Sequence, residues 1–206
     1  MSKVLYIILI SCFSLTIISC AKKSSTSSSS TTSSGLYFVG DNGTILTSTD
    51  GTTWDNSSSY DTPSRLRSVI YANSTFMTVG YWDEIILSSS DGITWDNKRS
   101  GTGNLRGVAY GNNKFVVVGL SGHISTSSDG TSWDNRTSGT TTTLIGVTYG
   151  NNKFMTIGKS GNTGTMLTSS NGTSWTSTSW TCSSCIDDNN SNLLSTYTLN
   201  DFTYIE

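Results

Sequence analysis

A sequence repeat that begins near residue 35 constrains this chain more than any other feature. Segments that start at Leu66, Leu105 and Leu144 share the pattern Leu-x-x-Val-x-Tyr and follow one another at a spacing of 39 residues. Each segment continues through an Asn-containing turn into an apolar run that a glycine closes. A unit of this length cannot bury its apolar side chains alone, so neighbouring units must pack on one another. The repeat therefore predicts an array of similar structural units.

Each unit predicts four short antiparallel strands. The second strand, such as residues 115–118, is apolar on both faces, which indicates burial on both sides of a sheet. An Asn-Asn turn before it supplies the positive φ of a tight hairpin, and an Asp-Gly or Asn-Gly turn forms a second hairpin before a polar outer strand. A four-stranded unit of about 40 residues is typical of a propeller blade. We therefore predict an all-β fold, a β-propeller of about four blades.

The predicted repeats cover residues 36–64, 66–104, 105–143 and 144–180, followed by a C-terminal closing segment, 181–206. The first repeat starts in its second strand, at Leu36, so its inner strand is missing. Residues 197–202 keep the Tyr-to-Phe spacing of the repeat, so we expect residues 194–199 to complete the first blade and close the ring. Residues 202–205 then compete with residues 36–39 for one position. An open array would expose edge strands and favour an oligomer.

Four turns carry a family resemblance. The sequences S-T-D-G-T-T-W, S-S-D-G-I-T-W, S-S-D-G-T-S-W and S-S-N-G-T-S-W resemble the Asp box of sialidase-type (BNR) propellers, and still more that of exported bacterial repeat proteins related to the photosystem II stability/assembly factor. The resemblance covers residues 35 to about 180, although Asp and Gly are adjacent here and one residue apart in the usual box. It implies structural roles, with the Asp side chain accepting backbone hydrogen bonds and the Trp packed between strands; a repeated calcium or sugar pocket is the alternative. The residues concerned are Asp50, Trp54, Asp91, Trp95, Asp129, Trp133, Asn171 and Trp175.

The N-terminus is typical of an export signal. Lys3 supplies a positive charge, and residues 4–18 are almost wholly apolar but short for a membrane span. The ending Ile-Ile-Ser-Cys at Cys20 resembles the lipobox of bacterial lipoproteins, which implies cleavage before Cys20 and a diacylglyceryl group on its thiol. An ordinary secretory signal is the alternative. Residues 1–19 are then a signal peptide, and the Ser/Thr-rich residues 20–34 are a tether that holds the domain at a membrane of the bacterial cell envelope.

Composition narrows the chemistry further. The net charge is −2 and only 13% of residues are charged, so no basic surface points to nucleic acid. Once the signal peptide is removed and Cys20 is lipidated, Cys182 and Cys185 remain, and a disulfide between them is the default in an exported protein. A zinc site would need two further ligands, and His123 is the only histidine. We therefore expect neither a metal nor a cofactor.

One end of the array is predicted to carry the ligand site. In a four-stranded meander, the turns that barely change between repeats lie at one end, and the loops that differ in every copy lie at the other. Binding residues concentrate on such variable loops. The predicted ligand face consists of Arg67, Trp82, Asp83, Glu84, Arg106 and Trp180. The alternatives are an aromatic plug over the blade core for Trp82 and charge pairs with loop carboxylates for the two arginines.

These features favour a lipid-anchored, non-catalytic propeller that binds a protein or a glycan. A sialidase-like glycosidase is one alternative, and the resemblance implies three arginines, a Tyr–Glu pair and an acidic general acid for it. Glu84 and Glu206 are the only glutamates, and Ile145 occupies the third arginine position. Ser-His-Asp chemistry would depend on His123, which reads as an exposed strand residue. A short, degenerate repeat protein that functions only as an oligomer is the other alternative.

Overall fold

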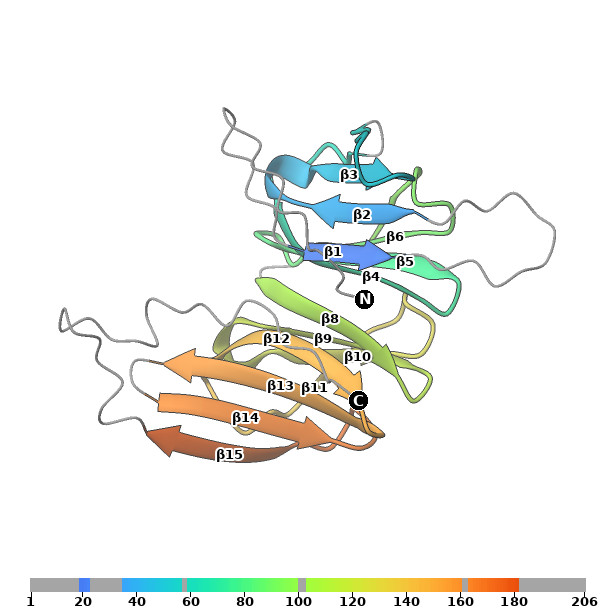
Figure 1. The fold of residues 1–206 in the computed structure, drawn as a ribbon. Coiled ribbons are helices and arrows are strands. Elements are labelled where there is room, and N and C mark those ends of the chain that lie inside the picture. Colours follow the sequence, from blue (N-terminus) through green and yellow to red (C-terminus); the bar gives the residue numbers. More distant parts are fainter. Residues whose placement is uncertain (1–18, 23–34, 57–58, 100–102, 161–162, 182–206) are drawn as a thin grey trace, which may run out of the picture.

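The structure is a computed structural model that describes residues 19–22, 35–56, 59–99, 103–160 and 163–181. Within these ranges the strands form four antiparallel sheets that follow one another along the chain (Figure 1). The first sheet has the order β1 (Ser19–Lys22), β2 (Leu36–Val39) and β3 (Ile45–Ser48). The second has the order β4 (Arg65–Ala72), β5 (Thr75–Tyr81), β6 (Ile86–Ser89) and β7 (Asp96–Arg99).

The third and fourth sheets repeat the same meander. The third consists of β8 (Leu105–Gly111), β9 (Lys114–Gly119), β10 (Ile124–Ser127) and β11 (Asp134–Arg136). The fourth consists of β12 (Thr143–Gly150), β13 (Lys153–Ser160), β14 (Thr163–Ser169) and β15 (Thr176–Thr181). Two short 3-10 turns, η1 (Asp41–Gly43) and η2 (Leu120–Gly122), join the second and third strands of the first and third sheets. The predicted all-β fold with four repeated sheets is confirmed.

The first sheet differs from the prediction in its inner strand. β1 pairs with β2 through Ser19 opposite Val39 and Lys22 opposite Leu36, so the chain upstream of the repeats occupies this position. Residues 20–22, expected in a tether, therefore lie in a strand, and residues 194–199, expected here, lie outside the described residues. The fourth strand position of this sheet is reduced to an isolated bridge between Thr47 and Asp55.

The hairpin turns have the backbone that their sequences predict. Asn112 and Asn113 have φ of 45° and 56°, and Asn151 and Asn152 have φ of 46° and 57°. The corresponding turn of the second sheet, Asn73–Ser74, has the same conformation with φ of 49° and 58°. Positive φ at two successive residues gives a turn whose twist matches that of the strands, and asparagine tolerates it better than most residues.

Apolar side chains fill the space between neighbouring sheets. The inner strands pack side by side in chain order, β1 against β4, β4 against β8, and β8 against β12. Each junction buries a phenylalanine of the following sheet, Phe76, Phe115 or Phe154, at 0–1% exposure. In Figure 1 the blue first sheet and the orange last sheet lie at the two ends of this array. In the part of the chain that the structure describes, no helix is long and apolar enough to span a membrane.

Candidate functional site

Two arginines stand at β-bulges where the inner strands begin. The register of β4 on β5 shifts between Leu66 and Ser68, and that of β8 on β9 shifts between Leu105 and Gly107. Arg67 and Arg106 are the residues that the ladder skips. A bulge leaves its extra residue unpaired and re-aims the side chain, which makes bulges frequent next to functional sites. The two arginines therefore occupy equivalent backbone positions in neighbouring sheets, at the same end of the array.

Both guanidinium groups lie against one aromatic ring. The Cζ of Arg67 is 5.6 Å from the centroid of the Tyr81 ring, and the Cζ of Arg106 is 5.8 Å from the same centroid. These distances fit cation–π contacts, which place both cations beside the Tyr81 ring. Burial and then the charge of Arg106 lower the pKa of Arg67, while Asp41 acts in the opposite direction. The Nε atoms of both arginines are buried without a hydrogen-bond partner.

Trp82 extends this cluster on the exposed side. The residue is 47% exposed, and its ring centroid lies 5.9 Å from that of Tyr81 and 5.4 Å from the Cζ of Arg65. An aromatic plug over the blade core would be buried, so this alternative for Trp82 does not describe the structure. Asn104 Oδ1 accepts a hydrogen bond of 2.7 Å from the Trp82 backbone N–H, which ties the loop to the third sheet.

The loop that carries Trp82 has an unusual backbone. Trp82, Asp83 and Glu84 have φ of 70°, 63° and 46°, three successive left-handed residues without a glycine. Such conformations are costly for residues with a Cβ, and they persist where the surrounding structure determines them. Asp83, the next residue in the chain after Trp82, is exposed.

Glu84 is not on the ligand face. It is 7% exposed, and its Oε1 lies 3.4 Å from His123 Nε2, which joins the second sheet to the third. The Glu84 N–H also donates to Gly103 O at 2.8 Å. The left-handed backbone of the loop turns this side chain inward, which its position in the sequence does not reveal. Trp180 lies in the outer strand β15, opposite Gly164, on a different sheet from the arginines.

Two side chains lie beside the same ring nitrogen of His123. Ser125 Oγ lies 2.8 Å from His123 Nε2, the same ring nitrogen that faces Glu84. In a Ser-His-acid triad the nucleophile and the acid contact different ring nitrogens, so that the base can take a proton on one while the other is held. The contact between His123 and Glu84 therefore links the second sheet to the third.

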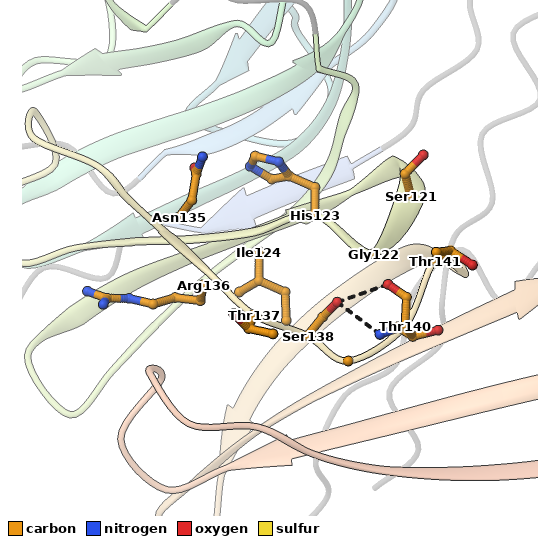
Figure 2. Close-up of a pocket in the computed structure, with 11 residues that line it drawn as sticks. Ser121, Gly122, His123, Ile124, Asn135, Arg136, Thr137, Ser138, Thr140 and Thr141 are labelled. Atoms are coloured by element: carbon orange, nitrogen blue, oxygen red, sulfur yellow. Dashed lines mark hydrogen bonds between the residues drawn. The ribbon is translucent and has the colours of Figure 1, made fainter.

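A groove beside His123 is a second feature of the variable-loop end (Figure 2). It has a volume of about 710 Å³ and lies between η2 and the loop from β11 to β12. Hydrogen-bonding groups dominate its lining, among them His123, Asn135, Arg136, Ser138 and Thr140. Arg136 is already engaged, since it donates to Asp134 Oδ2 and Thr126 Oγ1 at 2.8 Å each. No sequence motif marked this groove or the role of Tyr81, because both arise from residues brought together across the repeats.

The Asp-box side chains organise their own turns. Asp91 Oδ1 accepts hydrogen bonds of 2.8 Å from the backbone N–H groups of Ile93 and Thr94, and these bonds lower the pKa of Asp91 to about 2. Asp50 and Asp129 make the same contacts, which likewise hold the pKa of each below its usual value. Asn171 Oδ1 accepts the equivalent two bonds at 2.9 Å without a charge. Within the described ranges no three His, Cys, Asp or Glu side chains gather as metal ligands do.

Four consecutive antiparallel meanders with adjacent inner strands define a β-propeller architecture. No protein-family model matches the chain, and no curated protein matches it. Several solved propeller structures are similar to the chain. YCF48 from Cyanidioschyzon merolae is 20% identical, with a TM-score of 0.58 over 82% of this chain and 57% of that one. A structure of YCF48 bound to D1 peptide is also 20% identical, with a TM-score of 0.60 over 79% of this chain and 54% of that one.

A glycoside hydrolase shares the fold as well. The GH74 xyloglucanase from Xanthomonas campestris is 13% identical, with a TM-score of 0.55 over 69% of this chain and 28% of that one. At these identities the likeness extends to the fold alone. The chain spans a little more than half the length of the YCF48 chains that it resembles.

Proposed function

We propose that this chain is a non-catalytic propeller that binds an acidic segment of a partner protein at the Arg67–Tyr81–Arg106 cluster. The observation that carries the proposal is the pair of guanidinium groups on one ring, with two buried Nε–H donors that have no acceptor. Placing two like charges together costs free energy, and a buried donor without an acceptor adds to that cost. A carboxylate bound at the two guanidinium groups would offset the repulsion between them, because the guanidinium fork matches its geometry.

Two further observations support a protein ligand. Trp82 is exposed beside the cluster, and exposed aromatic and arginine side chains together are typical of interface hot spots. One of the similar propeller structures, that of YCF48, has a peptide bound to it. A flat, exposed aromatic with flanking cations suits an extended acidic peptide better than a deep pocket would.

Fluorescence anisotropy tests this function directly. The probes are a fluorescein-labelled acidic decapeptide with a free C-terminal carboxylate, the same peptide with its acidic residues changed to amides, and a basic decapeptide. We expect the acidic probe to bind and the other two not to bind. Arg67→Gln and Arg106→Gln should each weaken binding at least tenfold, because each removes a partly buried charge partner. Lys153→Gln, an exposed residue of the opposite end with the same charge change, is the control.

The outcome also tests what the arginines do. Arg67→Lys keeps the charge and loses the fork, so it should recover only part of the affinity if a carboxylate is bound in a bidentate manner. Equal binding of the acidic and amide probes would contradict the proposal. Equal binding by Arg67→Gln and the native chain would show that the peptide binds elsewhere, and the groove beside His123 would then be the alternative site.

We also propose that the propeller is exported and anchored through a lipid on Cys20. The support is the sequence alone, the positive and apolar N-terminus that ends in Ser-Cys. Cleavage before Cys20 would leave the remaining three residues of β1 in the chain. Metabolic labelling with a palmitate analogue should tag the native chain and leave Cys20→Ala untagged, whereas equal labelling would contradict the anchor.

The absence of catalysis is part of the proposal. Glu84, the one glutamate in the described residues, is buried and lies 3.4 Å from His123 Nε2, whereas a retaining glycosidase uses two carboxyl groups about 5–5.5 Å apart. We expect no hydrolysis of fluorogenic sialosides or β-glucosides. Hydrolysis that Glu84→Gln abolishes would establish the glycosidase alternative.

A further inference from the structure

The first sheet presents an apolar face to the outside of the array. Tyr37 and Val39 belong to the core shared with the second sheet, so alternation along β2 points Leu36 and Phe38 to the other side. Leu46, opposite Phe38 in the register, lies on that side, and the Trp54 ring is 4.6 Å from the Phe38 ring. We name Leu36, Phe38, Leu46 and Trp54 the leading face.

The fourth sheet presents a second apolar face at the other end. Phe154 and Leu167 belong to the core shared with the third sheet. The side chains that alternate with them along β13 and β14 therefore point away from that core. Ile157 lies opposite Met166 in the register, and Met155 shares their side. We name Met155, Ile157 and Met166 the trailing face. Neither face, as defined, contains a charged residue.

The inner junctions show what such faces pack against. Val79 and Ile86 occupy in the second sheet the positions of Ile157 and Met166, and both are 0% exposed against the third sheet. Phe76, Leu87 and Trp95 occupy in the second sheet the positions of Leu36, Leu46 and Trp54, and they are 0–7% exposed against the first. The residues of the two end faces are only half-buried.

At an inner junction, the residues of one sheet that correspond to the trailing face therefore pack on the residues of the next sheet that correspond to the leading face. The leading face of the first sheet and the trailing face of the fourth are the half-buried copies at the two ends. The first and fourth sheets, which carry them, lie at opposite ends of the array in Figure 1. We propose that a second copy of this chain covers both, so that the trailing face of each protomer packs on the leading face of the other. Two head-to-tail contacts close a ring of about eight blades, within the range of known propellers.

The length comparison supports this partner. The chain matches a little more than half of each YCF48 chain, so two copies together would have about the length of one such propeller. Because its two end faces are complementary, the array can pack on a second array of the same kind. The peptide site contributes no residue to either face, so the dimer does not depend on the proposed function.

Light scattering after size exclusion tests the dimer with the full 206-residue chain in mild detergent. One chain has a mass of 22.1 kDa, so we expect a protein mass of about 44 kDa. Phe38→Glu changes the leading face and Ile157→Lys changes the trailing face, and each variant alone should reduce the mass to that of one chain. Ile93→Lys is the control, because Ile93 is 64% exposed and lies on neither face.

Mixing the two variants gives the decisive measurement. A mixed pair has one native junction and one junction in which the new glutamate of the first variant faces the new lysine of the second, so an equimolar mixture should recover the dimer. Thermal unfolding of each variant checks that it remains folded, and Leu46→Gln with Met155→Gln replaces any pair that does not. A native chain at the mass of one copy, an undiminished mass in either variant, or a mixture that stays monomeric would overturn the proposal.

Discussion

Replacing Gly122 or Gly139 with alanine separates backbone strain from steric conflict in the groove beside His123. Both glycines line the groove and both have positive φ, +72° at Gly122 and +73° at Gly139. A Cβ at Gly122 would lie 1.9 Å from the carbonyl oxygen of Thr140, whereas a Cβ at Gly139 would meet nothing within 4 Å. The two variants therefore share the conformational cost, and only one adds a clash.

The two costs can be estimated separately. A left-handed residue with a Cβ costs about 1 kcal/mol relative to glycine. The clash at Gly122 involves backbone, so it must be relieved by moving the η2 turn or the loop before β12, and such forced shifts typically cost about 1–3 kcal/mol. We therefore expect Gly139→Ala to destabilise the chain by about 1 kcal/mol and Gly122→Ala by about 2–4 kcal/mol.

Urea unfolding followed by tryptophan fluorescence measures both values in one assay. Gly43→Ala is a second test, because its Cβ would lie 1.9 Å from Tyr60 O in the equivalent turn of the first sheet, with φ of +67°. It should behave like Gly122→Ala. Equal losses for Gly122→Ala and Gly139→Ala would refute the reasoning, since they would show that the positive φ alone determines the cost.

Two further predictions concern the repeated turns. Asp91→Ala should lose about 1 kcal/mol in urea unfolding at pH 7 because two backbone N–H groups lose their acceptor, whereas Asp91→Asn should lose less, since Asn171 makes the same bonds naturally. The pKa of Asp91 is lowered from 3.8 to about 2, so its charge stabilises the fold above about pH 4. That contribution to the free energy of unfolding disappears as the pH falls toward 2. The Asn variant should lose less stability across this pH range. Ser74→Asn should raise the melting temperature slightly, because Ser74 has φ of 58° where the other repeats have asparagine, and an unchanged or lower value would contradict this reading of the turn.

Repetition made most of the fold predictable. The strands, their order and the positive-φ turns follow from local patterns that recur three or four times, and each recurrence supports the others. The inner strand of the first sheet was not predictable in this way. Residues 19–22 are a short polar and small-residue segment without the repeat pattern, and their pairing with β2 is a contact between parts of the chain that share no motif.

The candidate site was predictable only in part. Comparison of the repeats predicted which end carries the variable loops and named both arginines, because they begin the inner strands at that end. It could not foresee that a bulge re-aims them or that Tyr81 brings them together, since these depend on the register of β4 and β8. The inward turn of Glu84 was hidden for a similar reason, because it depends on three left-handed residues in a loop without glycine.

The third copy of the bulge explains why the site has two arginines. β12 shifts register between Leu144 and Gly146, so Ile145 occupies the position that Arg67 and Arg106 hold in the preceding sheets. The backbone thus offers the same unpaired position three times, and an arginine at all three would place three like charges near one another at the end of the array. The backbone position is the same in the three sheets and its side chain differs, so the charged bulges alone distinguish the proposed site. Under the proposed function, charge at two neighbouring bulges beside the Tyr81 ring suits a single carboxylate-bearing segment.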